Sequence, residues 1–320
     1  MKKVIVMFHG SEEKREEIEA ICGERAEVMI LPHDADRETF ERAVRGADAL
    51  LGAVPPEWLE GTGLKWVHLP IAGANRIAGK PGVRDKILTN SSGAFGATIA
   101  EHSLSLLLAF ARHLPEYLRQ GARGEWKDCG CEWGLAGRRA LVLGTGDLGT
   151  QLALRLKALG LRVTGVCRTD DRPREPYERI FRSDRLDELL PEADVVFGCL
   201  PSTRSTTGLL DGRRLSLMRE GAILINVGRG DLIDTDALVG LLRQGKFTGV
   251  GLDVTDPEPL PPDHPLWSFD NVIVTPHVSG IGFGHLGQTQ SDVWSIALDN
   301  LRRWCAEEPL NNIVDQEQGY

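Results

Sequence analysis

The chain has 320 residues, of which 42% are hydrophobic and 26% charged, as in a globular protein with enough material for two domains. Its formal net charge of −9 argues against nucleic acid or an anionic membrane as the main partner, although a local cationic pocket can still take an anionic ligand. No apolar run reaches the roughly 20 residues that span a bilayer, and the run at 4–8 is too short for a signal peptide.

Short apolar runs alternate with charged helical stretches in the first part of the chain. Strands are expected at 4–8, 28–31, 49–51, 66–69 and 87–89, and amphipathic helices at 12–20 and 38–44. This βα alternation predicts a parallel sheet that is covered by helices on both faces.

A long helical pattern follows from Ala97 to about Gln120 and is apolar over much of its circumference. Such a helix is expected to be buried, here between domains or between subunits. The stretch after it, 121–134, is polar and carries glycines.

A second βα series begins with a strand at 140–143. Further strands are expected at 163–166, 193–198, 223–226, 249–252 and 272–274, and a final helix at about 289–305. Because that helix returns the chain toward the first series, the layout is expected to be discontinuous. The first domain would hold residues 1–98 plus 289–320, and the second residues 99–288.

The six cysteines are scattered along the chain, which favours reduced thiols in a cytoplasmic protein over a disulfide framework. Cys129 and Cys131 flank one glycine and could form a metal or redox pair. No second Cys or His pair stands nearby at ligand spacing, so we interpret them as an incidental loop pair and expect no metal site.

A glycine fingerprint, Gly144-Thr145-Gly146-Asp147-Leu148-Gly149, joins the strand at 140–143 to the helix that ends near Leu159. Gly144 permits the tight turn, Gly146 lets the backbone approach a pyrophosphate, and Gly149 lets the helix pack close to the sheet. The phosphates would then sit at the helix N-terminus, where free N–H groups favour anions. The alternative is a tight βα turn without a ligand.

The next strand determines which dinucleotide is expected. It normally ends in an acid that binds the adenosine ribose of NAD, but here Cys167 stands there, followed by Arg168 and Thr169. Without that carboxylate a 2′-phosphate is not repelled, and Arg168 can pair with it, so NADP(H) is expected to be preferred and NAD(H) possible. In the alternative interpretation, Arg168 is a solvated loop residue and Asp170 or Asp171 binds the ribose.

Arg229, Glu258 and His277 each lie just beyond an expected strand. In a doubly wound sheet these strand ends share one edge, where ligands bind. An arginine can grip a carboxylate, a histidine can move a proton, and a glutamate can hold that histidine charged. Each residue alone has an ordinary structural interpretation. Together, beside a dinucleotide fingerprint, they predict a hydride-transfer site.

With these motifs the chain resembles the D-2-hydroxyacid dehydrogenase family over essentially its whole length. The segments that carry the resemblance are 142–149, 199–203, 225–230, 251–254 with Glu258-Pro259, and 275–277. The resemblance implies an α/β protein with a Rossmann-type, doubly wound NAD(P)-binding domain and a flavodoxin-like substrate-binding domain. It also implies an NAD(P)-dependent oxidoreductase that interconverts small 2-oxoacids and D-2-hydroxyacids, and a homodimer.

The resemblance gives the three residues their roles. Arg229 would clamp the substrate carboxylate and its adjacent carbonyl oxygen, a planar target that suits a guanidinium fork better than a lysine. His277 would be the general acid in reduction and the general base in oxidation. Glu258 would orient the ring of His277 and keep its imidazolium charged near neutral pH.

Further contacts are implied by position. Asp253 would fix the nicotinamide carboxamide beside the Val227 backbone. The loop Ala72-Gly73-Ala74 would hold the substrate carboxylate through its N–H groups, although it is also explained as a plain turn. Other residues implied at the nicotinamide or the phosphates are Thr98, Asp147, Leu148, Leu200, Pro201, Thr206, Gly228 and Gly280, with Arg229 and His277 at the nicotinamide itself. Arg204 could reach the adenosine side.

The region of Arg168 and the run 263–267 are most similar to glyoxylate/hydroxypyruvate reductases and broad 2-ketoacid reductases. Phe95, Trp126 or Trp267 could shape the side-chain pocket, and we interpret His264 as a loop residue. Two other functions stay open: a non-catalytic protein that senses dinucleotides, and an enzyme of the same fold with a substrate that is not a 2-oxoacid, such as an oxyanion.

Overall fold

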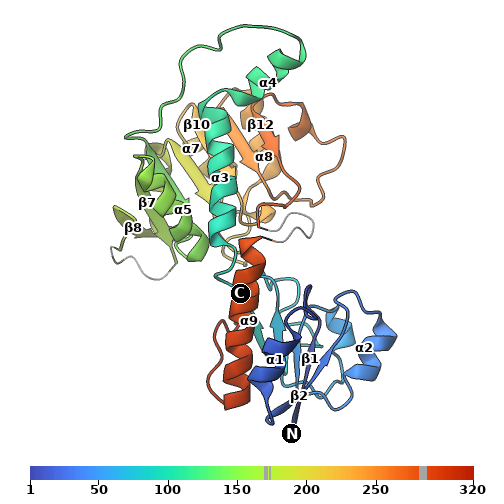
Figure 1. Cartoon of the computed structure of the whole chain (residues 1–320). Coiled ribbons are helices and arrows are strands. Elements are labelled where there is room, and N and C mark those ends of the chain that lie inside the picture. Colours follow the sequence, from blue (N-terminus) through green and yellow to red (C-terminus); the bar gives the residue numbers. More distant parts are fainter. Residues whose placement is uncertain (169–171, 173, 281–286) are drawn as a thin grey trace. The chain divides into compact units, whose positions relative to one another are not determined.

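The computed structural model describes residues 1–168, 172, 174–280 and 287–320. Thr169, Asp170 and Asp171, which enter the sequence-based expectations for the cofactor, lie outside these ranges. The chain divides into two compact units (Figure 1), the first made of residues 1–94 and 286–320 and the second of residues 95–285.

The first unit is built on a parallel sheet of five strands in the order β2-β1-β3-β4-β5. This is the 2-1-3-4-5 order of flavodoxin-like folds, so the predicted class of this unit is confirmed. The strands are β1 (Lys2–Val6), β2 (Ala26–Ile30), β3 (Ala49–Leu51), β4 (Trp66–Leu69) and β5 (Ile87–Asn90).

Three α-helices accompany this sheet: α1 (Arg15–Cys22), α2 (Arg37–Ala43) and α9 (Gln288–Ala306). The side chain of Asp36 accepts a hydrogen bond from the N–H of Thr39 at 2.8 Å and so caps the first turn of α2. Helix α9 comes from the second chain segment of the unit and packs beside α1 (Figure 1).

The second unit holds a parallel sheet of seven strands in the order β12-β11-β10-β9-β6-β7-β8. Counted from β6, this is the 3-2-1-4-5-6 order of the Rossmann fold with one further strand, as predicted. The strands are β6 (Arg139–Leu143), β7 (Arg162–Cys167), β8 (Arg179–Arg182), β9 (Val195–Gly198), β10 (Ala222–Asn226), β11 (Phe247–Leu252) and β12 (Val272–Val274). Strand β8 was missed because its sequence, RIFR, has no apolar run.

The single long helix expected at 97–120 is wrong in detail, because the structure has two helices there. Helix α3 (Gly96–Ala111) ends before His113, whose φ of 56° is left-handed, and α4 (Leu114–Ala122) starts anew. Pro115, in the first turn of α4, has no N–H to donate to the previous turn, so it cannot continue α3.

Helix α3 packs against the sheet of its own unit. A Cβ added at Gly249 in β11 would lie 2.3 Å from the ring of Phe110, so the glycine makes room for this helix. The sequence predicted burial between domains or subunits, whereas the contacts of the buried face are with β10, β11 and α5 (Asp147–Ala158). The other α-helices described in this unit are α6 (Leu186–Leu189), α7 (Gly212–Leu217) and α8 (Thr235–Arg243).

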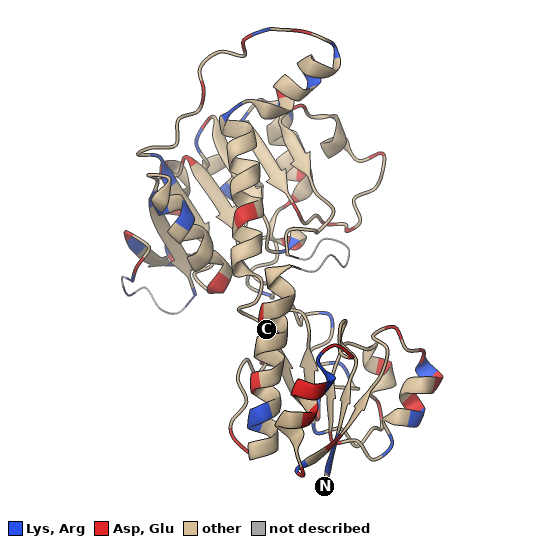
Figure 2. Ribbon diagram, viewed as in Figure 1, with Lys and Arg blue, Asp and Glu red and all other residues tan. Residues whose placement is uncertain are grey.

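Basic and acidic residues are interspersed along the ribbon of both units (Figure 2), in keeping with many exposed ion pairs such as Arg37–Glu41 and Arg185–Glu188. In the described part of the chain, no helix has the length and apolar character needed to cross a membrane.

Candidate functional site

The glycine fingerprint forms the turn between β6 and α5. A Cβ added at Gly149 would stand 1.9 Å from the carbonyl oxygen of Gly144, so any larger residue would push the helix away from the strand. At Gly146 such a Cβ meets nothing within 4 Å, and no side chain caps the start of α5. Open space beside uncapped helical N–H groups fits the pyrophosphate of a dinucleotide.

Two side chains stabilise this turn. Arg174 donates from Nη2 to the carbonyl oxygen of Thr145 at 2.9 Å and to its hydroxyl at 2.8 Å. Asp147, the first residue of α5, accepts a hydrogen bond from the N–H of Gly96 at the start of α3. Burial raises the pKa of the Asp147 carboxyl, and that hydrogen bond opposes the rise. The starts of α3 and α5 are therefore linked at the fingerprint.

The strand β7 ends at the position expected for the adenosine side of the cofactor. Cys167 is its last residue and is half-buried, and Arg168 follows directly with an exposed side chain. Arg174 belongs to the same connection, between β7 and β8, and was not among the residues that the sequence predicted at the cofactor. An arginine between two strands carries no pattern that distinguishes it from a solvated residue, which is why it was missed.

Arg229 follows β10 on a turn that Asn226 organises. The fully buried amide of Asn226 donates to the carbonyl oxygen of Arg229 at 2.8 Å and accepts from the N–H of Gly228 at 3.2 Å. Arg229 donates from Nη1 to the carbonyl oxygen of Gly228 at 2.7 Å. Asn226 was part of a motif in the sequence but received no role there. The signal was a polar residue at the end of an otherwise apolar strand.

Glu258 and His277 are brought into direct contact. Nδ1 of His277 lies 2.8 Å from Oε1 of Glu258, although the two residues follow different strands, β11 and β12. His277 has a left-handed φ of 55°, and its N–H donates to the carbonyl oxygen of Asp253 at 2.8 Å. The contact leaves Nε2 as the ring nitrogen available to a substrate.

Asp253 is buried behind this pair, with 1% of its surface exposed. Its carboxylate accepts hydrogen bonds from the N–H of Val278 at 2.9 Å, the N–H of Ser279 at 3.0 Å and the hydroxyl of Thr275 at 2.7 Å. Burial acts to raise the pKa of Asp253, but the hydrogen bonds from Ser279, Thr275 and Val278 outweigh it and lower the pKa below its ordinary value. The carboxylate thus fixes the backbone directly after His277 and the side chain of Thr275 before it.

His102 of α3 completes this cluster and was not anticipated. Its Nε2 lies 3.0 Å from Oγ1 of Thr275 and 3.8 Å from Oδ1 of Asp253. Because the Thr275 hydroxyl already donates to Asp253, its oxygen acts as the acceptor, which places a hydrogen on Nε2 of His102. In the sequence His102 sits in an apolar helical run and looks like a packing residue.

The other residues expected at the cofactor lie at the same strand ends or beside them. Thr98 is in the first turn of α3, and Leu200 and Pro201 follow β9. The hydroxyl of Thr206 donates to the carbonyl oxygen of Pro201 at 2.6 Å, which closes the loop after β9. A Cβ added at Gly280 would lie 3.3 Å from the ring of Phe95.

In the first unit, Ala72, Gly73 and Ala74 follow β4 at the carboxyl edge of the sheet. The side-chain amide of Asn90 donates to the carbonyl oxygen of Ala72 at 2.6 Å, and Ala74 is fully buried. Asn90, at the end of β5, therefore holds this loop in place.

The aromatic residues considered for a side-chain pocket differ in exposure. Phe95 is buried, Trp267 is 51% exposed and donates from Nε1 to the carbonyl oxygen of Pro261, and Trp126 is fully exposed. His264 accepts a hydrogen bond from the N–H of Leu266 at 3.2 Å and caps a short 3₁₀ turn. Within the described ranges, no cluster of three or more His, Cys, Asp or Glu side chains could hold a metal ion.

Comparisons with known proteins agree with this arrangement. Residues 104–279 match the family model of the NAD binding domain of D-isomer specific 2-hydroxyacid dehydrogenases. A glyoxylate reductase of Thermococcus onnurineus is 35% identical over 275 residues, which cover 81% of each chain.

Solved structures extend the likeness to both units. A D-isomer specific 2-hydroxyacid dehydrogenase family protein of Aeromonas salmonicida is 31% identical, with a TM-score of 0.84 over 98% of this chain and 99% of that one. An NADPH-dependent glyoxylate/hydroxypyruvate reductase of Sinorhizobium meliloti, solved with NADP and sulfate, is 26% identical, with a TM-score of 0.83 over 100% of both chains.

The chain belongs to the D-isomer specific 2-hydroxyacid dehydrogenase family. It is an NAD(P)-dependent oxidoreductase, as the sequence predicted.

Proposed function

We propose that the protein is an NADP(H)-preferring reductase that converts small 2-oxoacids of the glyoxylate, hydroxypyruvate and pyruvate type into D-2-hydroxyacids. The contact of 2.8 Å between Nδ1 of His277 and Oε1 of Glu258 carries this proposal, because it joins a proton donor to a carboxylate that orients it. The names of the relatives, glyoxylate reductase and glyoxylate/hydroxypyruvate reductase, point to the same class of substrate.

In this proposal His277 acts as the general acid for reduction. Glu258 accepts the hydrogen on Nδ1, so the second proton of the imidazolium is on Nε2 and can pass to the forming alkoxide. In the oxidation direction the neutral ring takes that proton back at Nε2. Removing a general acid of this kind typically lowers the rate by about 10²- to 10⁴-fold.

Arg229 is proposed to hold the substrate carboxylate and the neighbouring carbonyl oxygen. Its turn is fixed by the two hydrogen bonds of the buried Asn226, so the base of the guanidinium arm is preorganised. A planar fork of donors suits a planar 2-oxoacid, which explains an arginine here rather than a lysine. In the first unit, the loop Ala72-Gly73-Ala74 would supply backbone N–H groups to the substrate carboxylate.

A bound nicotinamide dinucleotide supplies the hydride. The residues that would hold it are those of the fingerprint, with the N–H groups at the start of α5 facing the pyrophosphate. The 2′-phosphate of NADP(H) would pair with Arg168, since Cys167 replaces the acid that would repel it.

The first test is the initial rate of NADPH and NADH oxidation with glyoxylate, hydroxypyruvate, pyruvate and phenylpyruvate. We expect turnover with NADPH well above turnover with NADH. Dinucleotide binding without turnover on any 2-oxoacid would favour the sensor or a different substrate and would reject the reductase proposal.

Two sets of variants separate the roles. Arg229→Ala and His277→Ala are expected to bind NADPH normally and to lose turnover by orders of magnitude; unchanged turnover would reject the mechanism. Arg168→Ala is expected to lower kcat/KM for NADPH about tenfold or more and to leave NADH unaffected. Arg162→Ala removes the same charge at the opposite end of β7 and is the matched control.

We also propose that the protein is a homodimer that associates through α4 and the segment after it. Leu114, Tyr117 and Leu118 form an exposed apolar stripe on α4, and the fully exposed Trp126 follows it. A second copy of the chain would bury this surface.

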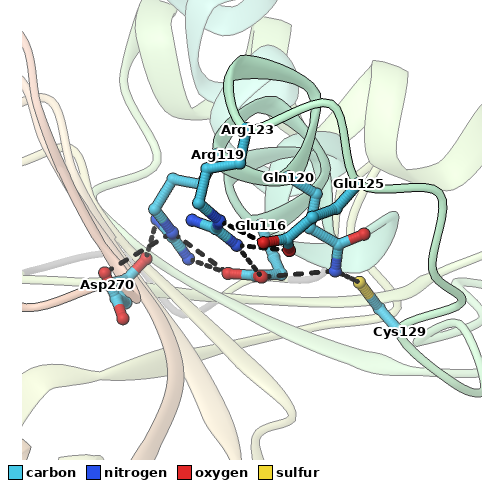
Figure 3. A network of polar contacts seen from close by, with 7 residues as sticks. All are labelled: Glu116, Arg119, Gln120, Arg123, Glu125, Cys129 and Asp270. Carbon is cyan, nitrogen blue, oxygen red and sulfur yellow. Dashed lines mark hydrogen bonds and ion pairs between the residues drawn. The ribbon is translucent and has the colours of Figure 1, made fainter.

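Polar contacts connect α4 to the segment after it and to the rest of its unit. Glu116 pairs with Arg119 at 2.8 Å and with Arg123 at 3.6 Å, and Arg119 reaches Asp270, which lies before β12, at 3.5 Å (Figure 3). Gln120 donates to Glu116 and to Sγ of Cys129. The contact of Arg119 with Asp270 joins α4 to the segment before β12.

A further inference from the structure

Two buried thiols meet where the two chain segments of the first unit pack together. Cys22 is the last residue of α1, and Cys305 lies in the last turn of α9. Their Sγ atoms are 4.0 Å apart, and both thiols are free. They are separated by 283 positions in the sequence, so only the packing of α1 on α9 brings them together.

The surroundings of the pair favour reaction at Cys305. Cys305 keeps 6% of its surface exposed, whereas Cys22 keeps 1%. The hydrogen bond with Cys22, helped by the charges of Lys2 and Arg25, lowers the pKa of Cys305 below its ordinary value against the opposing effect of burial. The pKa of Cys22 is raised, first by its hydrogen bond to Cys305 and then by burial.

Lys2 is held in place beside Cys305. Its Nζ donates to the carbonyl oxygen of Trp304 at 2.9 Å and pairs with Glu307 at 3.2 Å. The cation therefore stays next to the thiol that is more easily ionised. Packing alone requires neither two facing sulfurs nor a fixed cation, because two small apolar residues would fill the same space.

We propose that Cys22 and Cys305 form an oxidisable dithiol site that hydrogen peroxide converts into a disulfide between α1 and α9. The Sγ distance of 4.0 Å is about 2 Å longer than a formed S–S bond, a gap that side-chain rotation and a small helix shift can close.

The chemistry proceeds in two steps. The Cys305 thiolate attacks one oxygen of hydrogen peroxide, so an S–O bond forms, the O–O bond breaks, and hydroxide leaves with a proton as water. Cys22 then loses its proton and attacks the sulfur of the sulfenic acid, so the S–S bond forms, the S–O bond breaks, and hydroxide leaves with that proton as a second water. In total two thiols lose two electrons, and one peroxide becomes two waters.

The bond would fasten the N-terminal segment of the first unit to its C-terminal segment. The chain between the two cysteines includes the whole second unit, so the new covalent loop is long. Cross-links that close long loops restrict the unfolded chain most, which predicts a more stable first unit after oxidation.

Peptide mapping tests the proposal. The reduced full-length protein is treated with hydrogen peroxide, alkylated and digested with trypsin without reduction. We expect the peptide 16–25 and the peptide that begins at Trp304 to appear as one linked species and to disappear from the alkylated pool. Two alkylated peptides, or Cys305 oxidised to the sulfinic acid without a link to Cys22, would overturn the proposal.

Thermal unfolding gives a second measurement. We expect the unfolding transition of the oxidised protein to lie on the order of 5 °C above that of the reduced protein. Cys22→Ala and Cys305→Ala should each abolish both the linked peptide and this shift. The double variant Cys129→Ser/Cys131→Ser should retain both, since it removes only the cysteine pair of the loop after α4. A shift that survives Cys305→Ala would contradict the proposed bond.

Discussion

The buried carboxylate of Asp253 accepts a hydrogen bond from the N–H of Val278 at 2.9 Å, and Val278 is the residue directly after His277. The same carboxylate accepts hydrogen bonds from the hydroxyl of Thr275 and the N–H of Ser279. The carbonyl oxygen of Asp253 accepts a hydrogen bond from the N–H of His277 itself. Asp253 thereby holds the N–H groups of three successive residues, 277–279, and so fixes the left-handed backbone at His277. This backbone sets the direction of the imidazole.

Asp253→Asn is therefore expected to lower kcat by about tenfold or more. An amide has one acceptor atom where the carboxylate has two, so one hydrogen bond to a charged acceptor, worth about 1.5–3 kcal/mol, is lost. Steady-state kinetics together with the NADPH dissociation constant measures the effect. Asp270→Asn removes one charge from an exposed side chain and serves as the control. If NADPH binding weakens while kcat holds, Asp253 acts on the nicotinamide carboxamide instead.

Gly146 and Gly149 should respond differently to a methyl group. The space beside Gly146 is open, so Gly146→Ala should fold with unchanged stability but bind the dinucleotide more weakly. At Gly149 the methyl group would clash with the carbonyl oxygen of Gly144, so Gly149→Ala should unfold at a lower temperature. Melting curves with and without NADPH separate the two. Equal NADPH affinity of Gly146→Ala and the parent protein would show that no phosphate approaches there.

His68 should make stability depend on pH in the acid range. This histidine is fully buried in β4, and burial lowers its pKa to about 3 from an ordinary value near 6.5. The Ser91 hydroxyl donates to the carbonyl oxygen of Leu69 and so accepts from Nε2 of His68. With a hydrogen on Nε2, Nδ1 of the neutral ring accepts from the Thr89 hydroxyl at 2.7 Å.

The direction in which stability changes with pH follows from proton binding. Below pH 6.5 the unfolded chain binds a proton at His68 that the folded protein does not take up until pH falls to about 3, so stability decreases on acidification across this range. Between pH 6.5 and 5 the loss is about 2 kcal/mol. Urea titrations at several pH values measure it. His68→Gln should be less stable at neutral pH, and its free energy of unfolding should change less with pH because the contribution of His68 is gone. If the free energy of unfolding of the variant changes with pH as in the parent protein, the acid destabilisation does not come from His68.

The exposed stripe on α4 gives a test of assembly. Leu118 is 74% exposed and Trp126 fully exposed, so Leu118→Asp with Trp126→Ala should produce monomers if a second copy covers this surface. Light scattering after size exclusion measures the mass. Leu154→Asp adds the same charge to an exposed leucine of α5 and should leave the dimer intact. A parent protein that is already monomeric would reject the assembly.

Most of the fold could be predicted because it rests on local patterns. Apolar runs alternating with helical stretches predicted eleven of the twelve strands in the described part of the chain closely enough to give a parallel α/β protein, and glycines at fixed spacing located the fingerprint. The break at His113 and the strand β8 were missed. A left-handed residue has no signature in side-chain hydrophobicity, and a strand whose ends are arginines looks like a loop.

The sequence by itself determined which residues lie at the strand ends, because strand order and glycine spacing are properties of short segments. Arg229, Glu258 and His277 were found in this way. Only the tertiary structure decided that Glu258 contacts His277 and that Cys22 faces Cys305. It also decided that Asn226 fixes the turn at Arg229. Asp253 and His102 both contact Thr275, close to His277. These relationships join segments far apart in the chain, and they depend on how helices and strands pack, which no local pattern encodes.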